Sequence, residues 1–230
     1  MAGRSVRGRA GSVTMPSTPS PGLAVRNPWL PPSPTPEGDP AAGAVTPAGG
    51  PAPARGPVRP QRGVPAPDSA DQLPRRSAVA GVPLWVVGAH GGAGESTVAA
   101  LEPGWRASGH CWPQLDDSDV AVTDPARVIL VCRSHYSGLR AAQKAIAQWA
   151  AGLVQGLEFL GLVVIADAPG KLPRELRDFS RLVAAGAPRS WSLPWVPSWR
   201  LHPPVSPLPG DVGRVRDQLS HLTTSSTPQP

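Results

Sequence analysis

The sequence predicts one small three-layer α/β domain with a parallel sheet, preceded by a long disordered Pro-rich arm. More than half of the 32 prolines lie in residues 1–80. Across residues 81–202, short apolar runs alternate with amphipathic stretches of helical period, the pattern of βαβ units. A glycine-rich turn directly follows the first apolar run. Residues 203–230 are predicted to form a Pro-rich tail, with a short helix starting at Asp211.

The composition of the arm, residues 1–80, predicts disorder. It contains one Trp and no Phe, Tyr or Ile, so burial of apolar surface cannot offset the entropy of ordering it. Its arginines outnumber its acids, and the whole chain carries a net charge of +6. This excess favours weak contact with nucleic acid or an anionic membrane. The alternative is a coding bias towards arginine, because lysine occurs only at positions 144 and 171.

One segment of the arm differs from its surroundings. Trp29 and Leu30 are framed by Pro28, Pro31 and Pro32, and a tryptophan in such a segment has no local core to join. The segment is either a short docking motif for a protein partner or for the chain's own domain, or a chance placement.

The two cysteines and the hydropathy of the chain indicate its cellular compartment. Cys111 and Cys132 lack the spacing of a metal site, and Cys132 lies in an apolar run, so a core role is expected rather than a disulfide. No run approaches the eighteen apolar residues of a membrane span. A cytoplasmic protein is therefore expected.

The first predicted elements flank the glycine-rich turn. Leu84–Val87 is a short apolar run stopped by Gly88, as in a buried parallel strand. A helix is expected through Ser96–Leu101, ended by Pro103 and Gly104. Residues 104–126 predict no regular element.

Three further strands and two helices complete the predicted sheet. Val128–Cys132 is a buried strand, and residues 138–152 form a helix with an apolar face opposite a polar face. The apolar face comprises Leu139, Ala142, Ile146, Trp149 and Leu153, and the polar face Arg140, Lys144 and Gln148. Leu160–Ala166 is the third strand, a helix from about residue 173 to 185 turns Leu176, Phe179, Leu182 and Val183 inward, and Trp191–Leu193 is the fourth strand.

The glycine-rich turn has the chemistry of an anion site. Backbone N–H groups at the start of a helix attract negative charge, and glycines let phosphate approach the backbone. Phosphate-binding loops add a lysine for the β- and γ-phosphates and a hydroxyl for Mg²⁺. Here the octet is His90, Gly91, Gly92, Ala93, Gly94, Glu95, Ser96 and Thr97.

This octet resembles the deviant P-loop of the ParA/MinD group of ATPases, Lys-Gly-Gly-x-Gly-Lys-[Ser/Thr]-Thr. His90 replaces the signature lysine and Glu95 the phosphate-clamping lysine. The resemblance implies a P-loop NTPase-like fold over about residues 82–200. It also implies that Asp167 and the Leu193–Trp195 segment face the nucleotide base, and that dimers meet across nucleotide.

The departures from the family pattern argue against catalysis. The strand that carries the family's Asp-x-Pro-Pro-Gly switch has no clear counterpart before Val128, and the alternative places that switch at Asp167–Gly170. A carboxylate at Glu95 turns an attraction of roughly 4 kcal/mol per contact into repulsion. We therefore expect Glu95 to occupy the anion site, with no cofactor bound. The alternative is weak binding of ATP and Mg²⁺ through Ser96, Thr97 and Asp167 or Asp116.

Other candidate residues have a structural and a functional interpretation. His90 either meets an anion or a partner, or has no task. Asp116, Asp117 and Asp119 either bind Mg²⁺ or form a solvated loop. The residues Trp191, Trp195 and Trp199 recur every fourth position, but Pro194 and Pro197 exclude a helix. They either cover a pocket, to which Trp29 could bind, or pack the last strand onto the core.

Three functions follow, in order of preference. The first is a non-catalytic ParA/MinD-like relative that acts as an interaction or regulatory module, with an unidentified protein partner or as a homodimer. The second is a weak ATPase switch, and the third an adaptor that works through the arm and Trp29.

Overall fold

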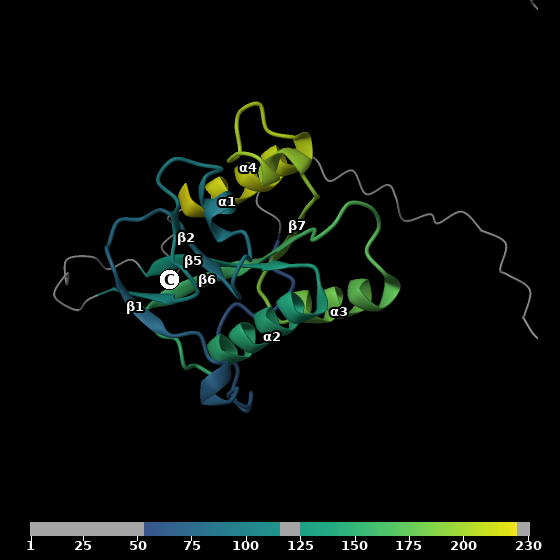
Figure 1. Cartoon of the computed structure of the whole chain (residues 1–230). Coiled ribbons are helices and arrows are strands. Elements are labelled where there is room, and N and C mark those ends of the chain that lie inside the picture. The colour runs from purple at the N-terminus through teal and green to yellow at the C-terminus, as the bar shows by residue number, and fades with distance from the viewer. Residues whose placement is uncertain (1–52, 116–124, 225–230) are drawn as a thin grey trace, which may run out of the picture. The chain divides into compact units, whose positions relative to one another are not determined.

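The predicted α/β class is confirmed by the computed structural model, which describes residues 53–115 and 125–224. A five-stranded, fully parallel sheet has the order β3-β2-β5-β6-β7 (Figure 1). Its strands are β2 (Trp85–Gly88), β3 (Arg106–Ala107), β5 (Ala126–Arg133), β6 (Leu157–Ile165) and β7 (Ser190–Leu193). A separate parallel pair is formed by β1 (Arg75–Ala78) and β4 (Trp112–Leu115).

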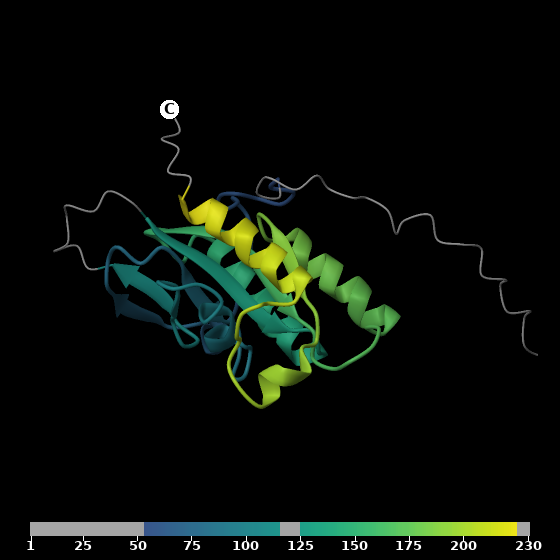
Figure 2. The ribbon, with the colours of Figure 1, turned by 90° about the horizontal axis from the view of Figure 1, so that it is seen from above.

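Four α-helices cover the two faces of the five-stranded sheet. They are α1 (Glu95–Ala99), α2 (Tyr136–Ala150), α3 (Arg174–Ala185) and α4 (Gly210–Thr224); the 3₁₀ turns are η1 (Ser69–Asp71) and η3 (Pro197–Arg200). In Figure 1, α2 and α3 lie on one side of the strands and α1 and α4 on the other. Figure 2 shows α4 lying over the sheet, roughly in line with the strands. The domain therefore has three layers.

Successive side chains of β5 point to opposite faces of the sheet and contribute to a hydrophobic core on each face. Val128, Leu130 and Cys132 pack towards α2, whereas Ile129 and Val131 pack towards α1 and α4. All five side chains are fully buried. A strand that is apolar on both faces suits a parallel sheet covered by helices on both sides.

Ordered structure begins earlier than the sequence predicts. Residues 53–80, assigned to the disordered arm, include η1 and β1. Val64, Leu73 and Ala78 pack against the core on the α2 side, and Lys144 pairs with Asp71 at 2.6 Å. This segment is ordered by contacts with distant residues, which its own composition does not reveal. Trp29 lies outside the described residues.

The stretch 104–126 is also more regular than expected. It contains β3, which pairs with β2, and β4, which pairs with β1. Trp112 at the start of β4 is fully buried. The acidic residues Asp116, Asp117, Asp119 and Asp124 lie outside the described part of the chain.

Three side chains differ from their predicted burial, and the C-terminal helix belongs to the domain. Gln148, predicted on the polar face of its helix, is 3% exposed, whereas Leu182, predicted inward, is 64% exposed. Leu153, predicted on the apolar face of the same helix as Gln148, is 41% exposed, because α2 ends at Ala150. The helix predicted from Asp211 is confirmed as α4. Its Val212 and Leu219 are fully buried, so this helix packs onto the domain and is not part of a tail. Gln148 is buried because segment 53–80 covers that side of α2, and Leu182 is exposed because no described element covers that side of α3.

Candidate functional site

The glycine loop lies where the strand order reverses. The chain passes from β2 to β3 on one side and then to β5 on the other, so β2 and β5 are neighbours. In doubly wound sheets, ligands bind in the crevice beyond the carboxyl ends of the strands at this switch point. The loop after β2 and the residues after β5 therefore occupy the expected position of a site.

Gly94 sets the shape of the loop. It precedes α1 with φ of 98°, a left-handed conformation that strains any residue with a Cβ. A Cβ there would lie 2.7 Å from Cδ1 of Ile165 at the end of β6. The loop thus packs tightly onto the sheet.

His90 joins the loop to the end of β5. Its Nε2 accepts a 3.2 Å hydrogen bond from the backbone N–H of Arg133. The proton of the neutral ring is then on Nδ1, which donates to the carbonyl of Gly91 at 2.8 Å. Burial lowers the pKa of His90, and the nearby His135, His110 and Arg133 act in the same direction against the Gly91 hydrogen bond. His90 is a neutral structural link, which disfavours the interpretation as a cationic anion contact.

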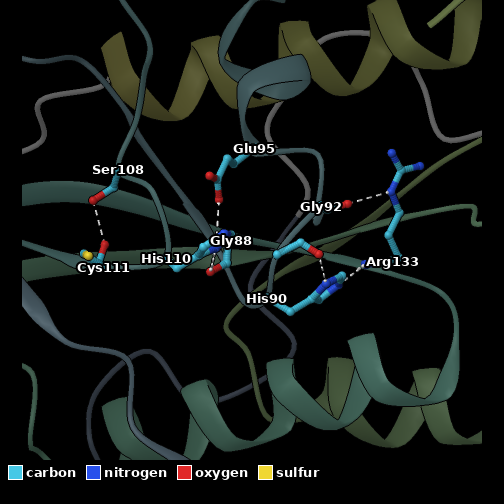
Figure 3. A network of polar contacts seen from close by, with 9 residues as sticks. Gly88, His90, Gly92, Glu95, Ser108, His110, Cys111 and Arg133 are labelled. Carbon is cyan, nitrogen blue, oxygen red and sulfur yellow. Dashed lines mark hydrogen bonds and ion pairs between the residues drawn. The ribbon is translucent and has the colours of Figure 1, made fainter. Parts of the chain in front are cut away.

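The carboxylate of Glu95 points away from the mouth of the loop. Its Oε2 lies 3.3 Å from Nδ1 of His110 and packs against Gly88, where any Cβ would collide with it. Figure 3 shows Glu95 directed at His110, with Arg133 on the other side of the loop. Oε2 is buried and accepts no hydrogen bond from the described residues.

His110 is held beneath Glu95 by a strained turn. It is the single non-glycine residue with positive φ (46°) among those described. The hydroxyl of Ser108 donates to the carbonyl of Cys111 at 2.6 Å and closes the turn (Figure 3). Nδ1 of His110 also lies 3.2 Å from the carbonyl oxygen of Gly88. Glu95 and His110 together thus fill the space behind the loop.

Arg133 is the cation at the front of the loop. Its Nε donates to the carbonyl of Gly92 at 3.3 Å, and its Nη1 donates to the carbonyl of Ala166 at 3.2 Å. The guanidinium therefore bridges the glycine loop and the end of β6. Three of its five N–H groups have no acceptor among the described residues.

A cavity of about 400 Å³ opens in front of the loop. Its lining includes seven residues singled out from the sequence: His90, Gly91, Gly92, Thr97, Asp167, Trp195 and Trp199. The remaining glycine-loop residues do not line this cavity. Ala93 is buried, Ser96 is exposed on α1, and neither Gly94 nor Glu95 lines the cavity. The expectation that Glu95 fills the anion site is therefore not met at this cavity.

Three lining residues with ionisable side chains were not singled out from the sequence. Arg133, His135 and Arg200 all face the cavity, and Arg200 lies over the ring of Trp195 at 5.6 Å. A usable signal existed for Arg133, since it directly follows a predicted buried strand, where site residues gather in parallel sheets. No comparable signal marks Arg200.

The described residues contain neither a metal-binding cluster nor a membrane-spanning helix. Residues 53–115 and 125–224 hold no group of three or more His, Cys, Asp or Glu side chains able to bind a metal ion. Within the same ranges, no helix has the length and apolar character needed to cross a membrane.

Comparison with known proteins gives one match. Residues 82–218 match the family model described as "Family of unknown function (DUF6668)". No curated protein and no solved structure matches the chain.

Proposed function

The chain belongs to the family of unknown function DUF6668, and we propose that its domain is a non-hydrolysing relative of ParA/MinD proteins that serves as an intracellular interaction or regulatory module. In this proposal the glycine loop retains its position at the sheet switch point and has lost phosphoryl transfer. The domain then works by binding and not by turnover.

The environment of Glu95 carries the proposal. Glu95 stands where the resemblance puts the phosphate-clamping lysine, and its carboxylate is enclosed by Gly88 and His110. Phosphoryl transfer needs a cation beside the β- and γ-phosphates. Glu95 supplies no such cation, because its side chain is acidic and is turned towards His110.

The competing function, a weak ATPase, draws on a different observation. Thr97 and Asp167 line the same cavity and offer a hydroxyl and a carboxylate for Mg²⁺. Ser96, which the resemblance aligns with the Mg²⁺-binding hydroxyl, is exposed on the outside of α1. This favours the non-hydrolysing alternative.

Titration with ATP and Mg²⁺, combined with a phosphate-release assay, tests the proposal. The wild-type chain should release no phosphate above the buffer rate and should bind ATP–Mg²⁺ no tighter than millimolar. Glu95→Lys should bind ATP–Mg²⁺ more tightly, while Glu175→Lys, the same charge change on the exposed first turn of α3, should not. Hydrolysis by the wild type would overturn the proposal.

A further inference from the structure

The cavity in front of the glycine loop has the side chains of a small-ligand site. It is lined by residues of the loop, by Arg133 after β5 and by residues of the Pro194–Arg200 segment after β7. Its volume of about 400 Å³ falls in the range of natural ligand pockets, roughly 300–1,000 Å³. A lone phosphate would leave most of it unfilled.

The part of the lining around Arg133 is suited to a phosphate. The guanidinium of Arg133 is fixed by two carbonyls, at 3.3 and 3.2 Å, so its remaining N–H groups are held in place before a ligand arrives. A planar guanidinium matches phosphate oxygens with two parallel hydrogen bonds. The hydroxyl of Thr97 lines the same space.

The tryptophans of the lining are suited to a planar ring. Trp195 and Trp199 both line the cavity and are partly buried, and Arg200 already stacks on Trp195. Indole faces bind nucleic-acid bases by stacking. Asp167, exposed at the rim of the cavity, offers an acceptor for ribose hydroxyls, a role that acidic residues play in dinucleotide sites.

The charge of the lining limits how many phosphates fit. Arg133 and Arg200 are two permanent cations, Asp167 is one anion, and burial lowers the pKa of His90 so that its ring is neutral. The net positive charge of about one suits a single phosphate. Each further phosphate adds charge near the loop, behind which lies the Glu95 carboxylate.

We propose that this cavity binds a nucleoside monophosphate without a metal ion, its phosphate on Arg133 and its base on Trp195 and Trp199. The inference rests on the proposed function, because it names the ligand that a non-hydrolysing domain would sense. Binding of such a ligand would join the glycine loop, the end of β6 and the segment after β7.

Calorimetric titration of the full-length chain in EDTA tests this with AMP, GMP, CMP and UMP. We expect at least one to bind with a dissociation constant on the order of 10–100 μM. Inorganic phosphate and the matching nucleoside should each bind at least about tenfold more weakly, since each makes only half of the contacts. Affinity should fall from the monophosphate to the diphosphate and the triphosphate.

Substitutions of lining residues test whether the monophosphate binds in this cavity. Arg133→Gln and Trp195→Ala should each weaken the bound monophosphate about tenfold or more. Arg200→Gln, at an exposed position, is a second charge variant that leaves the loop contacts intact and should also weaken binding. Arg181→Gln, on an arginine 74% exposed on α3, is the matched control and should bind as the wild type does.

Three results would overturn the inference: no monophosphate binding below about 1 mM, a requirement for Mg²⁺, or unchanged affinity in both arginine variants. These failures are separable from failure of the proposed function, which would show itself as ATP hydrolysis by the wild type. Absence of both monophosphate binding and hydrolysis would reject the ligand and leave the non-hydrolysing domain standing.

Discussion

The indole Nε1 of Trp112 donates a 2.9 Å hydrogen bond to Oε1 of Gln148, and both side chains are buried. The same amide also bonds both backbone groups of Leu73, accepting from its N–H and donating to its carbonyl, each at 3.0 Å. One side chain of α2 thus ties η1–β1 and β4 to the main domain.

Replacing Gln148 with Leu should destabilise the domain strongly. The change leaves the Trp112 indole N–H and both backbone groups of Leu73 without partners, and each buried unsatisfied group costs about 1–3 kcal/mol. We expect a loss of about 3–5 kcal/mol in the free energy of unfolding by urea. Gln143→Leu, on the same helix and bonded only to Arg140, is the control; an equal loss in both variants would contradict this account.

Gly88→Ala should displace the Glu95 carboxylate. The new Cβ would collide with Oε2 of Glu95 and lie 2.8 Å from Nδ1 of His110, so we expect a loss of about 1–3 kcal/mol in unfolding free energy. Adding Glu95→Ala removes the clash and should recover most of that loss. A double-mutant cycle by urea unfolding measures the coupling. Additive effects of the two changes would show that the carboxylate is elsewhere.

Gly91→Ala is the matched control for this cycle. A Cβ at Gly91 meets nothing within 4 Å, and its φ is not positive. Its substitution should change the unfolding free energy by no more than a few tenths of a kcal/mol.

Acidification should weaken the fold through His90. Burial lowers the pKa of His90 below its usual 6.5, so the unfolded chain binds more protons than the native chain as pH falls. Stability contributed by the neutral ring is therefore complete above about pH 6.5 and is lost as pH drops through the folded pKa. Urea unfolding between pH 8 and pH 5 should show this decline.

The variant His90→Gln isolates that part of the decline. It should be less stable than the wild type at pH 8 and lose less stability between pH 8 and pH 5. His202→Gln, at an exposed histidine, should keep the wild-type slope. Parallel curves for the wild type and His90→Gln would assign the pH dependence to other groups.

Leu219→Ala should show that α4 belongs to the folded domain. Leu219 is fully buried in the core cluster that includes Val98 and Trp191, and such a truncation costs about 2–5 kcal/mol. Leu201→Ala, at a leucine 86% exposed, should cost less than about 0.5 kcal/mol. Thermal and urea unfolding distinguish the two; similar small losses would make α4 a loosely held appendage.

The central strands were predictable from the sequence because their apolar runs are buried on both faces. Val128–Cys132 and Leu160–Ala166 match β5 and β6 within a few residues. By contrast, β1 reads Arg75-Arg76-Ser77-Ala78 and is mostly exposed, so no hydrophobic pattern marks it. Its pairing with β4 is set by residues far along the chain.

The site was predictable only in part, for a similar reason. The spacing of glycines marked the loop, and Asp167 and Trp195 were correctly grouped near it. The direction of the Glu95 side chain depends on His110, which the sequence gives no reason to place there. The importance of Arg133 depends on β5 lying beside β2, a matter of strand order that no local pattern encodes.

The hydrogen bonds between Gln148 and Leu73 determine which residues must be expressed for the domain to fold. The family match covers residues 82–218, yet Leu73 and β1 precede it and α4 runs on to Thr224. A protein truncated to the matched range would expose Trp112 and would leave the buried amide of Gln148 without its Leu73 partners. The unit of evolutionary similarity is thus shorter than the unit that folds, and expression should span at least residues 53–224.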